Sequence, residues 1–446
     1  MKNVLFLTYY FPPAGGSAVQ RTLKFAKYLP EYGWRPIVLT AETGSFVLHD
    51  ESLLQEIPEP VRVERTPAPD LYSVFSRFRR GKGGGADLAA LADPGSEGSF
   101  FLHAALFIRS CLFIPDARIG WFPHAVRKGI NLIRDRKNPV DVIFASAPPF
   151  TTLAAGMYLA KRSGLPFVID YRDPWTGAYF YFKRPFAAAR FEEFLERQCI
   201  RSASRIVSIN RRIVDGMPGH VDESRVHIIP NGFDPADFEH ISPYRDSSRF
   251  TIVYTGTQHA RMNARPLIQA AELAAEHSPD LAEHLLIRCI GRTSDDVKRM
   301  LKRSKLAATI ELEGHMDHRK CLDHAAGADL LLLLIPRGPG SELIVTGKLF
   351  EYLKSGRHVL CLAEQGDACR IIQRAKAGTC IHPDNLQETA GFLVQQFNRW
   401  KKGQSMQTAQ ADQSYIESFS RRKATGDLAR IFDSLYRAGR NPEQRP

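Results

Sequence analysis

Hydrophobic and polar positions alternate along the first half of the chain in two distinct patterns. Short apolar runs are typical of buried strands, and longer segments with a 3.6-residue period are typical of helices. Together they predict an alternating βα array. The predicted strands are 3–7, 36–39, 140–145, 166–169, 205–209 and 225–229, and the predicted helices are 17–29, 150–162 and 184–201.

The segment 230–248 is rich in Pro, Asn, Asp and Ser and predicts a domain boundary. Beyond it the alternation restarts. The predicted strands are 250–254, 284–290, 309–312, 329–335, 358–362 and 378–381, and the predicted helices are 265–276, 293–303, 319–325, 346–354 and 366–375. Two such arrays indicate an α/β protein with two parallel, doubly wound, Rossmann-like sheets that bind ligands at the carboxyl ends of their strands.

These patterns give a domain plan. We expect an N-terminal domain over 1–240, a C-terminal domain over 241–410 and a ligand site in the cleft between them. A C-terminal helix within 411–436 is expected to pack back toward the N-terminal domain, followed by a disordered polar tail over 437–446.

An insertion at about 71–123 falls outside the alternation. Residues 77–98 are Gly-rich and basic, which predicts a mobile loop. The apolar segment 100–115 is too short to span a bilayer and is interrupted by His103 and Arg109. It fits either a buried helix of the first domain or an interfacial segment at an anionic membrane surface.

The charge of the chain and its targeting signals limit the classes of binding partner and the cellular location that we expect. The formal net charge is +12, and the stretch from Leu71 to Val140 holds 11 Lys/Arg against 5 Asp/Glu. No zinc-finger spacing or RNP sequence is present, so phosphorylated ligands or an anionic membrane fit this charge better than nucleic acid. The apolar start ends at Pro12 without a cleavage site, which predicts a strand rather than a signal peptide. We expect a cytoplasmic protein, either free or peripheral at the inner face of the plasma membrane.

The seven cysteines are scattered, odd in number and never spaced as C-x-x-C. We interpret them as buried free thiols rather than as disulfides or metal ligands. Common ligand fingerprints are missing as well: the chain has no G-x-G-x-x-G, no G-x-x-x-x-G-K-[ST], no H-E-x-x-H, no G-x-S-x-G and no Asp-x-Asp. The last absence argues against a metal-bridged diphosphate site.

The strongest chemical candidate is the helix start at Thr346, Gly347, Lys348 and Glu351. Free backbone N–H groups at a helix start favour a phosphate, and Lys348 adds a full positive charge. Glu351 lies three residues on and on the same face, where a carboxylate can bind a vicinal diol. A cation and a carboxylate at this spacing suit a nucleoside diphosphate and its ribose. A surface i,i+3 ion pair is the competing interpretation.

Three further clusters follow predicted strands. Gly15 and Gly16 allow close approach of backbone to a phosphate or a sugar. Gly256 and Thr257, with Arg261 and Arg265, form a basic loop that can neutralise a leaving diphosphate. The third cluster consists of Asp170, Arg172, Asp173 and Trp175. It suits sugar hydroxyls and a pyranose face, or else forms a structural Arg–Asp pair beside a buried Trp.

In order along the chain, these segments resemble family 4 glycosyltransferases. The stretch Y-F-P-P…G-G resembles that family's donor-side glycine loop, and I-P-N-G-F-D at 229–234 resembles its interdomain segment. The helix G-K-L-F-E-Y-L-K-S-G at 347–356 is similar to the family's G/S-K-x-x-E-Y-x-x-x-G helix. S-A-P-P with D-Y-R-D-P-W is similar to a subgroup pattern, S-x-P-P…D-x-R-D-x-W. The resemblance covers nearly the whole chain and is weakest over 42–121.

The resemblance implies a GT-B fold, with two Rossmann-like domains facing across a cleft. It also implies retaining, metal-independent transfer of a sugar from a UDP- or GDP-linked donor. Glu351 would bind the ribose, Lys348 would face the diphosphate, and backbone groups near Gly314 would meet the base. The acceptor would be a saccharide or lipid-linked molecule of surface polysaccharide or glycolipid biosynthesis, with Asp170, Arg172 and Trp175 on the acceptor side and Asp173 a catalytic candidate.

The sequence departs from the family pattern at two points. Many members carry a second glutamate eight residues before the ribose-binding one, where this chain has Leu343; Glu342 stands nine before and is our substitute candidate. The usual Gly-Arg after the first C-terminal strand is Gly256-Thr257, so Arg261 and Arg265 both remain candidates for the phosphate-binding arginine. A sugar-nucleotide 2-epimerase and a catalytically silent binding scaffold are the alternative functions.

Overall fold

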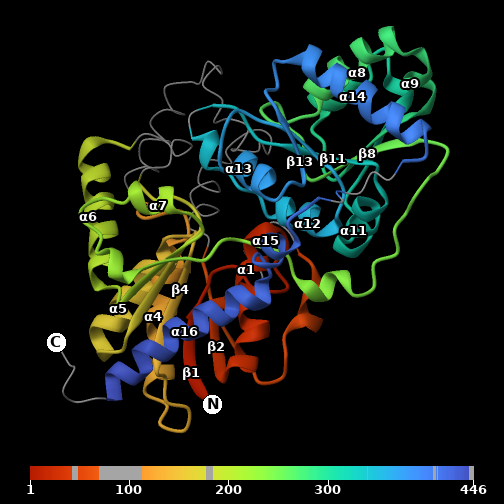
Figure 1. The fold of residues 1–446 in the computed structure, drawn as a ribbon. Coiled ribbons are helices and arrows are strands. Elements are labelled where there is room, and N and C mark those ends of the chain that lie inside the picture. The colour runs from red at the N-terminus through yellow and green to blue at the C-terminus, as the bar shows by residue number, and fades with distance from the viewer. Residues whose placement is uncertain are drawn as a thin grey trace, which may run out of the picture. The chain divides into compact units, whose positions relative to one another are not determined.

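The computed structural model of the chain describes residues 1–42, 49–69, 113–176, 184–338, 340–404, 408 and 410–440. The chain forms two compact units (Figure 1). The N-terminal unit comprises Met1–Pro230 and Ala424–Pro446, and the C-terminal unit comprises Asn231–Lys423. The division therefore falls at the start of the Pro- and Asn-rich segment 230–248. Most of the predicted insertion, including the loop 77–98 and the apolar segment as far as residue 112, lies outside the described residues.

The N-terminal unit is built on a seven-stranded parallel sheet in the order β3-β2-β1-β4-β5-β6-β7. The strand order reverses between β1 and β4, which makes this the switch point where a doubly wound sheet binds ligands. The strands are β1 (Lys2–Leu7), β2 (Trp34–Ala41), β3 (Arg62–Thr66), β4 (Val142–Ala147), β5 (Phe167–Tyr171), β6 (Arg205–Ser208) and β7 (Val226–Ile228).

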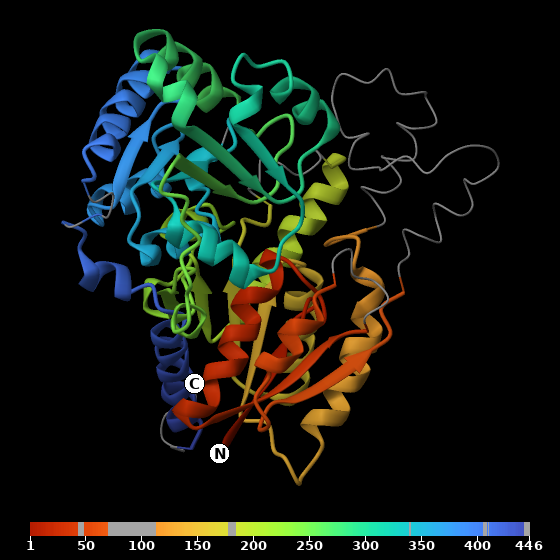
Figure 2. The ribbon, with the colours of Figure 1, turned by 90° about the vertical axis from the view of Figure 1, so that its right-hand side faces the viewer.

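Helices cover both faces of this sheet (Figure 2). In β4, Phe144 contacts Phe25 and Phe432 at ring-centroid distances of 6.2 and 5.7 Å, whereas the next residue, Ala145, faces Gly156. Because successive strand residues point to opposite faces, these contacts place α1 and α16 on one face and α5 on the other. The helices are α1 (Ser17–Tyr28), α4 (Phe122–Ile133), α5 (Thr151–Ser163), α6 (Phe186–Ser202), α7 (Arg211–Asp215) and α16 (Arg421–Arg440).

The C-terminal helix α16 completes the N-terminal unit. Its residues from Ala424 onward belong to this unit, and it lies beside β1 and β2 in Figure 1. Trp34 packs edge-on against Phe432 at 5.3 Å, and its indole N–H donates to Asp433 at 2.9 Å. The helix continues through Arg440, so the first part of the expected tail 437–446 is helical; residues 441–446 are outside the described part.

The C-terminal unit contains a six-stranded parallel sheet in the order β10-β9-β8-β11-β12-β13. Its switch point lies between β8 and β11. The strands are β8 (Phe250–Thr255), β9 (Leu285–Ile290), β10 (Ile310–Glu313), β11 (Leu330–Leu334), β12 (Val359–Leu362) and β13 (Gly378–Ile381). The helices are α8 (Arg265–His277), α9 (Pro279–His284), α10 (Asp295–Leu301), α11 (His318–Gly327), α12 (Gly347–Ser355), α13 (Asp367–Arg374), α14 (Leu386–Lys401) and α15 (Gln413–Glu417).

Alternate residues of the strands in the C-terminal unit pack into two separate hydrophobic cores, one on each face of the sheet. Ile252 packs into the core formed with α8 and α14, and Val253 packs into the core formed with α12 and α13. The segment around Gly232 joins the second core: a Cβ on Gly232 would lie 1.8 Å from the Phe419 carbonyl oxygen. Only glycine allows this approach of two backbone segments. The close packing within this unit therefore explains why residue 232 is a glycine.

The predicted α/β class with two parallel, doubly wound sheets is confirmed. Within the described residues, thirteen strands are present; they include all twelve predicted from the sequence, with ends that differ by at most two residues, and β3 was not predicted. Helices α4, α7, α9 and α14 were also missed. Within the described residues, no helix is long and apolar enough to cross a membrane.

Candidate functional site

Three glycines follow adjacent strands at one edge of the C-terminal sheet. Gly256 follows β8, Gly291 follows β9 and Gly314 follows β10. Gly256 donates its N–H to Ile290, and Gly291 donates to the carbonyl of Gly314 at 3.0 Å. A Cβ on Gly291 would come within 2.5 Å of the Gly256 carbonyl oxygen. The three glycine turns lie directly beside one another. They place backbone groups, without side chains, at the edge where a doubly wound sheet binds ligands.

Lys348 reaches this edge from the first turn of α12. Its Nζ lies 4.6 Å from the ring centroid of Tyr254 and 3.4 Å from the phenol oxygen. A Cβ on Gly256, whose φ is +132°, would lie only 2.1 Å from the same Nζ. The structure thus brings Lys348 and Gly256 together. Burial lowers the pKa of Lys348 to about 8, although the negative charge of Glu351 opposes part of that shift.

The position of α12 is held by a buried tyrosine. Tyr352 accepts a hydrogen bond from the backbone N–H of Thr255 at 2.8 Å, and its phenol oxygen lies 3.0 Å from the Thr255 hydroxyl. Tyr352 and its neighbour Leu353 are fully buried in the core beneath the helix. The end of β8 is therefore tied to the middle of α12, and this contact helps to position Lys348 beside Gly256.

Glu351 lies one turn further along α12 with partners of its own. His318, the first residue of α11, places its Nε2 3.1 Å from the Glu351 carboxylate, and its Nδ1 lies 3.9 Å from Asp237. Burial alone would raise the pKa of Glu351, but the hydrogen bond and charge of His318, with Arg421 and Lys348, outweigh it and lower the pKa. Glu351 is thus a carboxylate held in a defined orientation.

Lys348 and Glu351 do not form the surface ion pair that was the alternative interpretation. In the described structure, Lys348 turns to Tyr254 and Glu351 turns to His318. Two opposite charges on one helix face normally pair when nothing else orients them. Here each is oriented by a separate neighbour, which leaves both available to one ligand.

The helix start itself is open. Thr346 occupies the N-cap position as expected, but its hydroxyl makes no capping hydrogen bond. A Cβ added to Gly347 would meet no atom of the described structure within 4 Å. An uncapped, open helix start beside a lysine is a suitable place for an anion.

The basic loop after β8 is exposed. Thr257, Arg261 and Arg265 all lie at the surface, with Arg265 as the first residue of α8. Neither arginine has an ion-pair partner among the described residues. Gln258 anchors the loop by accepting a hydrogen bond from the backbone N–H of Ala264 at 2.9 Å. Both arginines therefore remain candidates to reach a diphosphate.

Glu342 belongs to a short 3-10 turn, Ser341–Leu343, and is half-buried. Gly366, just before α13, packs against it so closely that a Cβ there would lie 2.8 Å from the Glu342 Cα. The Ser341 hydroxyl donates to Glu364 at 3.0 Å. The turn that carries Glu342 is thus fastened to the start of α13.

In the N-terminal unit, Gly15 and Gly16 form the turn between β1 and α1. Gly16 is the N-cap of α1, with φ +86°, and is exposed. A Cβ on Gly15 would lie 3.3 Å from the Cβ of Asp50. The positive φ of Gly16 favours glycine for a conformational reason, and the exposed N-cap places it at the sheet's switch point.

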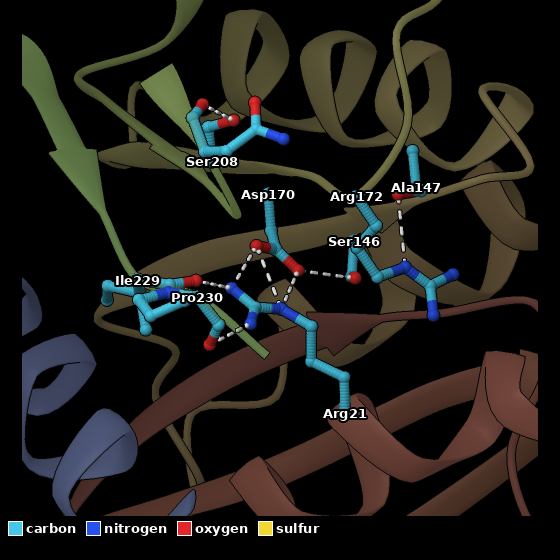
Figure 3. Close-up of polar contacts among 9 residues, drawn as sticks. Arg21, Ser146, Ala147, Asp170, Arg172, Ser208, Ile229 and Pro230 are labelled. Carbon is cyan, nitrogen blue, oxygen red and sulfur yellow. Dashed lines mark hydrogen bonds and ion pairs between the residues drawn. The ribbon is translucent and has the colours of Figure 1, made fainter. Parts of the chain in front are cut away.

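Asp170 is wholly buried in a polar network at the end of β5 (Figure 3). Arg21 of α1 forms a buried ion pair with it at 2.8 Å, and Ser146 donates to it at 2.7 Å. The same guanidinium donates to the backbone carbonyls of Ile229 and Pro230 at 2.9 and 3.0 Å. The pair proposed as the structural alternative is present, but Arg21 is the partner, not Arg172.

Arg172 and Trp175 are buried too. Arg172 donates to the backbone carbonyls of Ala147, Pro148 and Ala18. Trp175 stacks on Phe150 with ring centroids 4.7 Å apart. These contacts support a positioning role for both side chains.

Asp173 is the most exposed acid of this cluster, since its side chain is only half-buried. Burial raises its pKa, and the neighbouring charge of Arg172 opposes the shift. Among the described residues of this cluster, the Asp173 side chain makes no hydrogen bond to the network around Asp170 and is less buried than Asp170, Arg172 or Trp175.

Four residues of these clusters were not singled out in the sequence: Arg21, Tyr254, Gly291 and His318. Gly291 follows a predicted strand and carried a usable signal. The other three have partners that lie 33 or more residues away in sequence, so only the fold brings them together.

Residues 16–232 match the family model described as a glycosyl transferase 4-like domain. The matched residues contain α1, strands β2 to β7 of the seven-stranded sheet, the Asp170 network and residues 229–232 of the I-P-N-G-F-D segment.

Solved structures match nearly the whole chain, including the part beyond residue 232. TarM is 11% identical with a TM-score of 0.60, over 97% of this chain and 99% of that one. WaaG, a glycosyltransferase involved in lipopolysaccharide biosynthesis, is 17% identical with a TM-score of 0.55, over 96% and 99%. A putative UDP-N-acetylglucosamine 2-epimerase from Listeria monocytogenes is 13% identical with a TM-score of 0.56, over 98% and 97%. These likenesses show the GT-B fold; no curated protein matches the chain.

Proposed function

We propose that the chain is a retaining glycosyltransferase that transfers a sugar from a UDP- or GDP-linked donor to a saccharide or lipid-linked acceptor. One observation carries the proposal: at the switch point of the C-terminal sheet Lys348 lies against Gly256, and Glu351, one turn along the same helix, is oriented by His318. The glycosyltransferase 4-like domain and the GT-B fold support it.

The C-terminal unit would hold the donor. The diphosphate would lie at the open start of α12, against Lys348 and the backbone of Gly347. Glu351, oriented by His318, would accept hydrogen bonds from the ribose hydroxyls. The stacked turns at Gly256, Gly291 and Gly314 would meet the nucleoside through backbone groups. Glu342 and Thr346 would flank the transferred sugar from the same loop.

In the transfer step the anomeric C–O bond to the diphosphate breaks, and positive charge develops on the sugar. The negative charge that leaves with the diphosphate would be stabilised by Lys348, with Arg261 or Arg265 from the exposed loop. We propose that these cations make an added divalent ion unnecessary. Initial rates that rise severalfold with Mg²⁺ or Mn²⁺ would contradict this point.

The N-terminal unit would supply the acceptor side. Asp173, at the end of the buried Asp170 network, is our candidate to contact a reacting hydroxyl, with Gly15 and Gly16 approaching the donor through their backbone. A facing arrangement of the two units, with the site in the cleft between them, belongs to this proposal. So does a role in surface polysaccharide or glycolipid biosynthesis, at the cytoplasmic side of the membrane.

The test is incubation of the full chain with UDP- and GDP-linked sugars, with and without extracts that contain lipid-linked and saccharide acceptors. Release of nucleoside diphosphate that depends on an acceptor supports the proposal, and the anomeric configuration of the product decides retention. Conversion of the sugar without acceptor would instead indicate an epimerase. Binding without any turnover would indicate a silent scaffold.

A further inference from the structure

Three cysteines from three elements converge in the C-terminal unit. Cys361 lies on β12, Cys380 lies on β13 and Cys369 lies in the first turn of α13. Their sulfur atoms all lie within 4.8 Å of one another. None of the three residues is spaced as C-x-x-C, which is why the sequence alone indicates only scattered free thiols. We refer to them as the three-cysteine cluster.

The topology of the sheet produces this convergence. Cys361 and Cys380 are direct partners in the parallel ladder between β12 and β13, so their side chains leave the same face. Helix α13 connects these two strands and crosses that face, and its Ala368 and Ile372 pack into the same core. Cys369 is therefore carried onto the two strand cysteines by the crossover itself.

The burial and the spacing of the three cysteines are those expected of metal ligands. Cys361 and Cys369 are at most 1% exposed, whereas Cys380 is half-buried and opens the cluster on one side. All three are free thiols. Three sulfurs bound to one zinc ion at about 2.3 Å stand about 3.8 Å apart in tetrahedral geometry, so the present spacing needs only a small contraction.

We propose that the three-cysteine cluster binds one thiophilic d10 cation of the Zn²⁺ class. Soft thiolate ligands select such ions over Mg²⁺ or Ca²⁺. The cation would offset two of the three thiolate charges, and the positive end of α13, where Cys369 lies, favours the remaining one. A water molecule would be the fourth ligand, on the side of Cys380, the least buried of the three.

A cation here would have a structural consequence for the neighbouring loop. It would join β12, β13 and the first turn of α13. Gly366, just before α13, packs on Glu342, and Glu364 accepts a hydrogen bond from Ser341. The cation would thus stiffen the support of the turn Ser341–Leu343. This role is separate from sugar transfer and does not depend on it.

The experiment uses the full chain, reduced and freed of metal by a chelator under anaerobic conditions. Zn²⁺ is titrated in competition with a chromophoric chelator, and Co²⁺ is used as a spectroscopic probe. We expect one equivalent of Zn²⁺, a thiolate-to-cobalt charge-transfer band and a rise in Tm with Zn²⁺. Cys380→Ser should weaken Zn²⁺ binding by more than the roughly 10- to 100-fold that loss of an outer-shell partner costs.

Cys321→Ser is the matched control, because Cys321 is a half-buried free thiol of the same unit outside the cluster. It should bind Zn²⁺ as the parent does. Equal metal-free Tm values for the parent and Cys380→Ser establish that the variant folds, and Cys361→Ser repeats the test if they differ. Failure of the parent to bind an equivalent, binding unchanged in both cluster variants, or a disulfide within the cluster of the metal-free protein as isolated would each overturn the proposal.

Discussion

Two groups of charged residues follow strands in this chain, one in each unit, and they differ in what surrounds them. Asp170 and Arg172 in the N-terminal unit are buried, and Arg21, Ser146 and backbone carbonyls satisfy them. In the C-terminal unit, the Lys348 ammonium lies beside Tyr254 and the turn at Gly256, and burial lowers its pKa. The buried ion pair of Asp170 with Arg21 stabilises the fold of the N-terminal unit. Lys348 is instead a partly desolvated cation beside an open helix start, and such a residue is suited to bind an anionic ligand.

The largest effect should come from breaking the buried pair. Asp170→Ala leaves Arg21 buried without its carboxylate, and we expect it to lower the free energy of unfolding of the N-terminal unit by about 3–5 kcal/mol. Thermal melting of the full chain measures this. Asp215→Ala, which removes an exposed ion pair with Arg211, is the control and should cost at most about 1 kcal/mol. Normal melting together with a raised KM for acceptor would show that Asp170 binds acceptor instead.

Removing the positive charge of Lys348 should lower the rate of sugar transfer rather than the stability of the fold. Lys348→Ala should lower kcat/KM for the donor by about 100- to 1000-fold, since it removes a preorganised charge at the leaving diphosphate. Steady-state release of nucleoside diphosphate measures this. Lys354→Ala is the control, because it changes the net charge of the same helix equally but removes an ion pair with Glu417. Its kcat/KM for the donor should stay within about twofold of the parent value. Parallel losses in the two variants would contradict the comparison.

Placing a methyl group between the two donor-site segments should have an intermediate effect. Gly256→Ala puts a Cβ on the Lys348 ammonium at a backbone φ of +132°, and strain of this kind costs about 1–3 kcal/mol. We expect affinity for UDP or GDP to fall about tenfold in calorimetric titration, since 1.4 kcal/mol is a factor of ten. Gly403→Ala introduces positive-φ strain at +64° without a neighbouring atom, and its affinity should match the parent.

The smallest effect is a pH dependence. Lys348 has a pKa of about 8 in the ligand-free protein, so it is charged below that pH and loses its proton above it. Affinity for the nucleoside diphosphate should therefore fall about three- to tenfold between pH 7 and pH 9. Lys348→Arg keeps its charge throughout this range and should give a flat profile. A parent profile as flat as that of the variant would show that Lys348 does not meet the anion.

The fold was predictable because its strands are apolar runs between breakers. The missed strand, β3 (R-V-E-R-T), carries charged residues on an edge of the sheet, so it lacks the apolar signal of a central strand. Lys348 and Glu351 were found because both stand in one short helix motif. Arg21 and His318 were not, because each acts across more than thirty residues of sequence.

The cysteines show the same limit. Their positions in sequence indicate nothing beyond free thiols, and only the register between β12 and β13 places Cys361 opposite Cys380. Contacts made by strand pairing and helix crossover depend on the whole sheet. A motif search that looks for short spacings does not detect them.

The central claim is that one helix start binds a nucleoside diphosphate through two separate contacts, Lys348 on the phosphates and Glu351 on the ribose. Calorimetry with UDP or GDP and, separately, with inorganic pyrophosphate tests it in the parent, Lys348→Ala and Glu351→Ala. We predict that Lys348→Ala weakens both ligands. Glu351→Ala should weaken the nucleotide about 10- to 100-fold, the loss of hydrogen bonds to a charged acceptor, and leave pyrophosphate unchanged. Equal nucleotide affinity in all three proteins, or loss of pyrophosphate binding in Glu351→Ala, would contradict the account.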